Sequence, residues 1–322
     1  MNMIGRSPPF VNVLKNIKKI SCYDIPVLIE GETGTGKELA ARAIHYLGPR
    51  RDFPFIPVNC GAIPDNLIEN ELFGHEKGAY TDAKSSQQGI IALANHGTIF
   101  LDEVEALSLK GQIVLLRFFE DQVYKPLGAS RPSKANVRII AASNENLSQL
   151  VERGLFRQDL FYRLNIVQIE IPPLSQRGED IKLLADYFLN KYKSAYRQQD
   201  KFLHPDSYKW LKRNSWPGNV RELENLLHSE FLLAEGPCME LGKGSSAQKD
   251  RRTNLIDRRE NHLFQDNFNE AKSSIISRFE KAYLKQLFQE ANGNVTLAAK
   301  RAGKERRALG KLLKKHGISK AN

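Results

Sequence analysis

A glycine-rich turn that ends in a lysine is the clearest chemical feature of the sequence. Residues 31–38 read GETGTGKE, after the apolar run at 25–29 and before the helix-forming stretch at 39–44. A strand, a glycine-rich turn and a helix in this order predict a phosphate-binding P-loop. The three glycines let successive N–H groups face one anion, and the helix N-terminus adds partial positive charge. We expect Lys37 to reach the β- and γ-phosphates of ATP.

The residue after this lysine departs from the general P-loop pattern. Ser or Thr commonly stands there as a Mg²⁺ ligand, whereas this sequence has Glu38, so the metal must be held mainly by another carboxylate. The apolar stretch 97–101 supplies one, because it is followed by Asp102 and Glu103 in the Walker B pattern. We expect Asp102 to bind Mg²⁺, directly or through water, and Glu103 to orient and polarise the attacking water. Together with the P-loop, these acids predict an ATPase.

Two further apolar stretches end in asparagine. Asn59 follows residues 55–58, where it is placed to touch the γ-phosphate or the catalytic carboxylate, or simply to form a turn. Asn144 ends the stretch that begins at Val137, and it is placed to sense the γ-phosphate. Both asparagines are therefore candidates for the predicted nucleotide site.

These side chains must be positioned by a parallel sheet. Five apolar stretches alternate with helical ones and predict strands at 25–29, 55–60, 97–103, 137–144 and 166–171. Such alternation is typical of an α/β fold with a parallel five-stranded sheet and helices on both faces. Phosphates bind at the carboxyl ends of strands in such folds.

The segment 71–83, ELFGHEKGAYTDA, is polar and punctuated by glycine, with an aromatic residue at its centre. This pattern predicts an exposed loop with Tyr80 and Thr81 near its tip. The ring of Tyr80 either contacts a partner or folds back and packs.

Residues 178–235 have a helical period and predict an α-helical lid. Asn219 is placed to cap a helix that begins at Val220, which brings Arg221 into the first turn. An arginine there opposes the helix dipole and therefore favours a phosphate partner, although Glu222 or Glu224 can pair with it instead.

The net charge of +11 is concentrated at the C-terminal end. Residues 1–235 carry 29 Lys and Arg against 28 Asp and Glu, whereas residues 236–322 carry 19 against 9. An uneven charge of this kind indicates a polyanion partner for one end of the chain, or a solvated basic tail.

The C-terminal pattern favours DNA as the polyanion. A polar linker at 237–267 precedes an amphipathic helix at 268–291 and a pair of short helices at 293–318 that divide at Ala302 and Gly303. Two helices joined by a glycine turn predict a helix-turn-helix, and the basic second helix suits a DNA major groove. A membrane-surface helix is the disfavoured alternative, because the segment is short and broken by glycine. The expected DNA-binding residues are Lys304, Arg306, Arg307, Lys311, Lys314 and Lys315.

Composition limits the remaining possibilities. No apolar run approaches eighteen residues, the N-terminus lacks the layout of a signal peptide, and the three cysteines lack CxxC spacing. We therefore expect a cytoplasmic protein without a membrane partner, disulfide framework or zinc site. Because the first predicted strand begins near Ile25, we also expect no sensory domain before the ATPase.

Seven motifs in order give the sequence a family resemblance: GETGTGKE, VNCGAI, ELFGHEKGAYTDA, GTIFLDEVEAL, VRIIAASNENL, FRQDLFYRLN and WPGNVRELEN. Over residues 4–235 they closely resemble the bacterial enhancer-binding proteins, which are AAA+ activators of sigma-54 RNA polymerase. The C-terminal segment is similar to their Fis-type DNA-binding domain. The resemblance implies a AAA+ α/β subdomain at 1–172, a lid at 173–236, a linker at 237–267 and a Fis-type helix-turn-helix domain at 268–322.

The same resemblance implies roles for individual residues. The family also has Glu after the P-loop lysine, and it forms rings, usually hexamers, with ATP between neighbours. Arg157 and Arg163 are then arginine fingers acting in trans, Asn59 couples the nucleotide state to the loop, Asn144 is the sensor and Arg221 is the lid sensor. The implied nucleotide-binding residues are Ile4, Gly5, Gly31, Glu32, Thr33, Gly34, Thr35, Gly36, Lys37, Glu38 and Arg221.

One departure from the family lies in the exposed loop. Family members that remodel sigma-54 have GAFTGA there, whereas this sequence has Gly78, Ala79, Tyr80, Thr81, Asp82 and Ala83. Tyr for Phe keeps the ring, but Asp82 for Gly adds a charge that a six-fold ring would bring together around its pore.

The function that the sequence predicts is therefore that of a bacterial, nucleoid-associated, ATP-hydrolysing regulator. It binds double-stranded DNA at upstream activator sites, assembles into oligomers from a dimer up to a hexamer ring, and remodels sigma-54 holoenzyme. Its activity is controlled by a regulatory protein in trans, by its expression level or by a sensor outside this sequence. One alternative is a DNA-binding regulator independent of sigma-54, in which ATP controls oligomerisation, and Asp82 favours it. Another is a AAA+ remodeller of a different protein.

Overall fold

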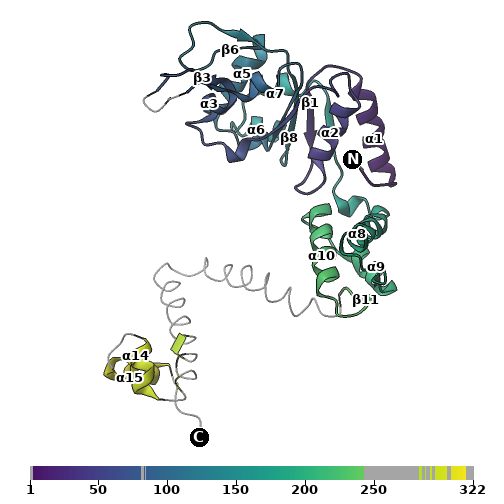
Figure 1. Cartoon of the computed structure of the whole chain (residues 1–322). Coiled ribbons are helices and arrows are strands. Elements are labelled where there is room, and N and C mark those ends of the chain that lie inside the picture. Colours follow the sequence, from purple (N-terminus) through teal and green to yellow (C-terminus); the bar gives the residue numbers. More distant parts are fainter. Residues whose placement is uncertain are drawn as a thin grey trace. The chain divides into compact units, whose positions relative to one another are not determined.

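The chain divides into two compact units, Met1–Gly242 and Lys243–Asn322 (Figure 1). The computed structural model describes residues 3–80, 83, 85–242, 283–284, 287, 291, 294–302 and 306–316. The first unit contains the sheet and the lid, and the described part of the second unit contains two short helices. None of the helices in the described ranges combines the length and the apolar run that crossing a bilayer requires.

A parallel five-stranded sheet forms the centre of the first unit, as the sequence predicts. Its strands lie in the order β2-β5-β8-β1-β9, and every neighbouring pair is parallel. The strand bounds are β1 (Val27–Glu30), β2 (Phe55–Asn59), β5 (Thr98–Asp102), β8 (Arg138–Ser143) and β9 (Gln168–Glu170). The central strands are buried because both sheet faces are covered, which is why they are nearly continuous apolar runs in the sequence.

Helices cover both faces of this sheet (Figure 1). Ile29, Phe100 and Ile140 pack with α1 (Pro8–Ser21) and α2 (Lys37–Tyr46) in one hydrophobic cluster. Leu28 and Leu101, which point to the opposite face, belong to a second cluster. Its helices are α3 (Ile68–Phe73), α4 (Ile90–Leu93), α5 (Leu109–Asp121), α6 (Leu147–Glu152) and α7 (Gln158–Leu164).

Two short antiparallel ribbons accompany the second set of helices. They pair β3 (Gly74–His75) with β4 (Gln87–Gln88), and β6 (Val123–Tyr124) with β7 (Ser133–Lys134). The backbone N–H of Glu76 donates to Leu127 O at 2.9 Å, so the base of the loop that carries Tyr80 is fixed to the segment after β6.

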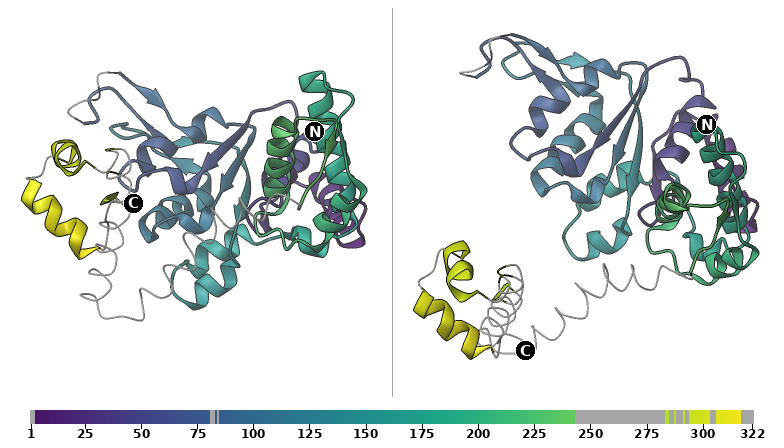
Figure 2. Two further views of the ribbon diagram at one scale, coloured as in Figure 1. Left: turned by 90° about the horizontal axis from the view of Figure 1, so that it is seen from below. Right: turned by 60° about the horizontal axis from the view of Figure 1, so that its bottom comes forward.

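The lid is a separate group of helices, drawn in teal and green in both views of Figure 2. Its elements are α8 (Asp180–Tyr196), β10 (Phe202–Leu203), α9 (Pro205–Arg213), α10 (Asn219–Leu233) and β11 (Cys238–Met239). Trp216 is fully buried among these helices, and its indole N–H donates to Leu211 O at 2.8 Å. The lid therefore has its own hydrophobic core.

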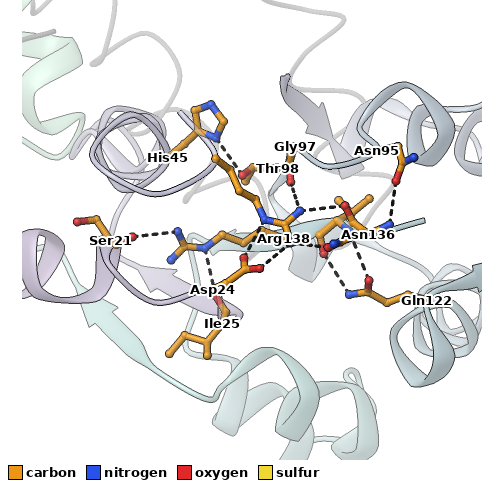
Figure 3. Close-up of polar contacts among 12 residues, drawn as sticks. Ser21, Asp24, Ile25, His45, Asn95, Gly97, Thr98, Gln122, Asn136 and Arg138 are labelled. Carbon is orange, nitrogen blue, oxygen red and sulfur yellow. Dashed lines mark hydrogen bonds and ion pairs between the residues drawn. The ribbon is translucent and has the colours of Figure 1, made fainter. Parts of the chain in front are cut away.

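A polar cluster lies at the amino ends of the strands, opposite the P-loop (Figure 3). The buried guanidinium of Arg138 donates to the carbonyl oxygens of Ile20, Ser21 and Ile25 at 3.3–3.5 Å. Arg50 forms an ion pair with Asp24 at 2.6 Å. These contacts join α1 to the starts of β1 and β8.

In the second unit, α14 (Val295–Arg301) packs against α15 (Arg306–Lys315). Ala298, Leu309 and Leu313 form a small buried cluster with Leu284, Leu287 and Ala291. The predicted turn at Gly303 and most of the predicted linker and helix at 237–291 lie outside the described residues. The helix-turn-helix therefore remains a prediction.

Candidate nucleotide-binding site

A cavity of about 490 Å³ lies where the carboxyl ends of the strands meet the lid. Three parts of the chain line it: the P-loop with the start of α2, the ends of β5 and β8, and the lid with the N-terminal segment. Of the residues predicted to bind or hydrolyse a nucleotide, the lining contains Ile4, Thr33, Gly34, Thr35, Gly36, Lys37, Glu38, Asp102, Glu103, Asn144 and Arg221.

At two positions of the P-loop, the backbone has a conformation that only glycine adopts without strain. Gly34 has φ 80° and Gly36 has φ 101°, both in the left-handed region. A Cβ on Gly34 would also lie 2.3 Å from Gly218 O. The ten-residue helix α2 begins directly after Gly36, so its N-terminal N–H groups face the anion site.

Lys37 is 7% exposed, and its ammonium lies inside the loop. Lys37 Nζ donates to Gly31 O at 2.6 Å, to Glu32 O at 3.1 Å and to Asn144 Oδ1 at 2.7 Å. Burial lowers the pKa of Lys37, and the nearby carboxylates, Asp102 first, oppose this shift. Gly31 and Glu32 thus hold the lysine through their carbonyl groups and do not line the cavity.

Asp102 and Glu103 lie at the end of β5, beside Lys37. Burial raises the pKa of Asp102, while the positive charge of Lys37 acts in the opposite direction. Glu103 has φ 55° and ψ 47°, a left-handed backbone that costs a non-glycine residue roughly 1–2 kcal/mol. Strained backbone of this kind clusters at functional sites, and here it aims an acidic side chain at the cavity.

Asn144 is the centre of the polar contacts in this site. Its Oδ1 accepts hydrogen bonds from Lys37 and from Thr33 Oγ1, the latter at 3.1 Å. Its backbone N–H and its Nδ2 both donate to Glu105 Oε1, at 3.0 and 2.9 Å. Glu105 was not predicted as a site residue; its proximity to the Walker B acids was the available signal.

Asn59 forms a turn, which is one of the three possibilities that the sequence leaves open. Its Oδ1 accepts the backbone N–H of Ala62 at 3.1 Å. Asn59 does not line the cavity. A Cβ added to Gly61 would lie 3.3 Å from Asn59 Oδ1 and 3.0 Å from Glu103 Oε2. Gly61 therefore leaves space between the asparagine and the predicted catalytic acid.

Most of the residues that line the lid side of the cavity were not predicted from the sequence. Arg177 is buried, and its guanidinium lies 3.6 Å from the centre of the Phe10 ring while its Nε donates to Asp180 at 3.0 Å. This side is mostly apolar and suits a flat ring such as a nucleobase. The missed lining residues are Met3, Phe10, Leu39, Arg177, Leu184, Tyr187, Phe188, Lys191, Val220 and Glu224. Gly5 does not line the cavity, because the Phe10 ring occupies the space beside it.

The predicted cap at Asn219 is wrong. The helix α10 begins at Asn219 itself, after Gly218, and Asn219 is fully buried with φ 52°. Its side chain is hydrogen-bonded to the P-loop and to Leu174 instead of to the next turn of its own helix.

Arg221 is exposed at the cavity, and the described chain shows no ion pair between it and Glu222 or Glu224.

The two predicted arginine fingers lie away from this cavity. Arg157 precedes α7 and pairs with Asp159 at 2.7 Å, and Arg163 is an exposed residue of α7. Neither lines the cavity of its own chain. An action on that cavity must therefore come from another chain.

The predicted loop and DNA-binding residues are partly described. Tyr80 is 46% exposed, with its ring 5.1 Å from that of His75, whereas Thr81 and Asp82 lie outside the described residues. Lys304 also lies outside them. All five predicted DNA-binding residues of α15 are exposed, whereas Leu309 and Leu313 face inward. The five are Arg306, Arg307, Lys311, Lys314 and Lys315.

The residues of the cavity fit a nucleoside triphosphate with Mg²⁺. The left-handed glycines and the helix N-terminus suit phosphates, Lys37 supplies a positive charge, and the apolar lid side suits a base. Among the described residues no group of three or more metal-binding side chains occurs, but Mg²⁺ needs only one or two carboxylates besides the substrate phosphates. Asp102 meets that requirement.

The P-loop, parallel sheet and helical lid together define a AAA+ nucleotide-binding module. The family model of the "Sigma-54 interaction domain" matches residues 3–170, and that of the "AAA+ ATPase lid domain" matches residues 175–254. The chain belongs to the sigma-54-dependent transcriptional activators.

Individual relatives agree with this family. The chain is 40% identical to the transcriptional regulatory protein GlrR of Escherichia coli K12, over 98% of this chain and 68% of GlrR. It is 47% identical to the DNA-binding transcriptional regulator NtrC of Salmonella typhimurium, over 73% of this chain and 50% of NtrC. The crystal structure of NtrX from Brucella abortus in complex with ATP is similar with a TM-score of 0.71 and 31% identity, covering 99% of this chain and 70% of NtrX.

Proposed function

We propose that this protein is an ATP-hydrolysing, ring-forming, DNA-binding transcriptional regulator that remodels sigma-54 RNA polymerase holoenzyme. The observation that supports the proposal most is the meeting of Lys37, Asp102, Glu103 and Asn144 at one cavity beside the P-loop. Membership of a nucleotide-binding family does not by itself imply ATP hydrolysis. Hydrolysis needs a positive charge, an acid that holds the metal and an acid that orients water, and these three groups meet at this cavity.

In this proposal each residue has one task. Lys37 and the N–H groups of the P-loop hold the phosphates, and Glu103 orients and polarises the attacking water. Asn144, fixed by Glu105, detects the γ-phosphate. Asp102 would hold Mg²⁺, and the bound ion would neutralise part of the negative charge of the phosphates.

The remaining charge on the transferring group requires a second chain. Arg157 and Arg163 lie outside the cavity of their own chain, so a neighbour in a ring must provide them. Such an arginine finger contributes about 10³- to 10⁵-fold to the rate. NtrX, one of the similar solved proteins, was crystallised in complex with ATP, which supports the choice of nucleotide.

The exposed loop and the basic α15 provide the two macromolecular contacts of the proposal. Tyr80 lies half-exposed near the predicted tip of the loop, where ATP turnover moves it against the holoenzyme. The exposed arginines and lysines of α15 place the ring at upstream DNA.

Transcription in vitro from a sigma-54 promoter, with holoenzyme, ATP and the full chain, tests the proposal. We expect open complexes with wild-type protein and none with Glu103→Gln, which retains ATP binding but loses turnover. Open complexes formed only by Asp82→Gly would instead support a regulator independent of sigma-54. Absence of concentration-dependent ATP hydrolysis would contradict the mechanism altogether.

A further inference from the structure

Asn219 joins three segments of the first unit that are far apart in the sequence. Its Oδ1 accepts the backbone N–H of Leu174 at 2.7 Å, and its Nδ2 donates to Glu32 Oε2 and to Thr33 O, both at 3.0 Å. The residue is 0% exposed. Its side-chain amide therefore makes two hydrogen bonds to the P-loop and one to the segment that enters the lid.

The backbone next to Asn219 continues the same contact. The N–H of Val220 donates to Gly34 O at 3.1 Å, and a Cβ on Gly34 would lie 2.3 Å from Gly218 O. Two consecutive carbonyl groups of the P-loop, those of Thr33 and Gly34, thus point at the start of α10. Because these acceptors are turned toward the lid, the loop leaves its N–H groups for an anion.

The backbone conformation of Asn219 restricts which residues can stand there. With φ 52° it is left-handed, a region that Asn, Asp and Gly tolerate better than other residues. Asn219 does not line the cavity, so it cannot touch a bound nucleotide. An effect on binding passes through its neighbours, namely Glu32 and Thr33 of the P-loop and the adjoining first turn of α10, whose Val220 N–H contacts Gly34 O.

We propose that Asn219 is a positioning residue through which the lid holds the P-loop in its anion-binding conformation. The inference rests on the proposed function, since it assigns the lid a part in ATP affinity. It also assigns Glu32 a different task from direct nucleotide binding: its carboxylate anchors the loop to α10. A displacement of α10 then changes the shape of the phosphate site directly.

Asn219→Asp is the test variant. Asp keeps the size, the tolerance of a left-handed backbone and the acceptor for Leu174 N–H, but it loses both donations and faces Glu32 with a second carboxylate. We expect the Kd of the full chain for a ribose-labelled fluorescent ATP analogue to rise at least about tenfold. At saturating ATP we expect kcat to change less than about threefold, because the loss is one of uniform binding.

A reciprocal pair of variants provides the control. Glu32→Gln alone keeps an oxygen acceptor for Asn219 and should bind the analogue nearly as wild type does. Combining Asn219→Asp with Glu32→Gln exchanges donor and acceptor between residues 219 and 32, so it should recover part of the lost affinity, whereas Thr33 O stays without its donor. If Asn219→Asp fails to fold, Asn219→Gly replaces it, since glycine keeps the backbone and removes the side chain.

The outcomes separate this inference from the proposed function. It is overturned if Asn219→Asp binds the analogue like wild type, or if only its melting temperature falls. It is also overturned if the double variant binds no more tightly than Asn219→Asp. A wild-type chain that binds no analogue overturns the proposed function, and the inference with it.

Discussion

Glu105 holds Asn144 at the nucleotide site through one carboxylate oxygen. Glu105 Oε1 accepts both N–H groups of Asn144, so removing the carboxylate frees the sensor from its position. We expect Glu105→Ala to lower ATP turnover at saturating ATP about tenfold, which corresponds to about 1.4 kcal/mol of transition-state stabilisation. Steady-state ATPase assays measure this effect.

The matched control keeps the contact and removes the charge. Glu105→Gln retains an oxygen at the same position and should keep turnover within about threefold of wild type, if the hydrogen bonds to Asn144 are what matters. Equal loss in the two variants would instead show that the negative charge beside Lys37 is required.

His45 gives the molecule a pH dependence that is separate from catalysis. It is fully buried, and its Nδ1 lies 2.9 Å from Thr98 Oγ1 (Figure 3). Burial lowers the pKa of His45; a backbone hydrogen bond with Phe53 opposes this shift, and the charge of Arg138 adds to it. The folded state therefore binds fewer protons than the unfolded state below pH 6.5.

From this sign, acid must destabilise the fold. As the pH falls below 6.5, His45 becomes protonated in the unfolded state but stays neutral in the folded state. The free energy of unfolding therefore decreases by up to about 1.4 kcal/mol per pH unit. His45→Gln should remove this part of the dependence. Urea unfolding followed by circular dichroism at pH 7.5 and 5.5 measures it, and an identical pH dependence in both proteins would contradict the assignment.

Residues in a short local pattern were predictable, and residues defined by distant partners were not. Lys37 and Asp102 follow strands in recognisable motifs, and the structure places both at one cavity. Asn219 was misassigned because its partner Glu32 is 187 positions away, a contact that local capping rules do not contain. Arg177 was missed for the same reason, since it faces Phe10 only after folding.

At the scale of elements, the proposed function assigns the DNA contacts of the second unit to α15. It presents Arg306, Arg307, Lys311 and Lys314 to solvent while Leu309 packs inward. If about six phosphates are neutralised, specific affinity should fall by roughly three decades between 50 and 200 mM salt. Fluorescence anisotropy with an upstream-site duplex of the regulated promoter measures this slope.

The contribution of a single charged side chain of α15 to the salt dependence of DNA affinity should then be measurable. Arg307→Ala should lower the magnitude of the slope of log affinity against log salt by about one, and Arg307→Lys should leave it unchanged because the charge is kept. A slope that is the same in wild type and in the alanine variant would exclude Arg307 from the phosphate contacts.

Elements with a long apolar pattern were predicted well, and short elements were not. All five strands of the sheet lie in apolar runs of the sequence, the three central strands β1, β5 and β8 are buried on both faces, and the structure confirms the parallel sheet. By contrast, β10 and β11 have two residues each, and α4 has four, so neither a period of 2 nor one of 3.6 can be detected in them. Packing against larger neighbours defines these elements.

At the scale of the whole molecule, the proposed mechanism requires two chains for each nucleotide. One chain supplies the P-loop, Lys37 and the acids, and its neighbour supplies Arg163, which lies outside its own cavity. A contact of this head-to-tail kind closes into a ring. Activity should therefore depend on protein concentration, and two inactive variants should complement each other.

Mixing Lys37→Ala chains with Arg163→Ala chains tests this requirement. Each variant alone is inactive: the first lacks the ammonium in every site, and the second lacks the finger in every site. In an equal mixture about one quarter of the interfaces combine an intact P-loop with an intact Arg163, so we expect up to about one quarter of the wild-type rate. Because Arg157 also lies outside the cavity, replacing Arg163→Ala with Arg157→Ala should give the same recovery if both arginines act in trans. No recovery in either mixture, or full activity of a dilute single chain, would show that each chain completes its own site.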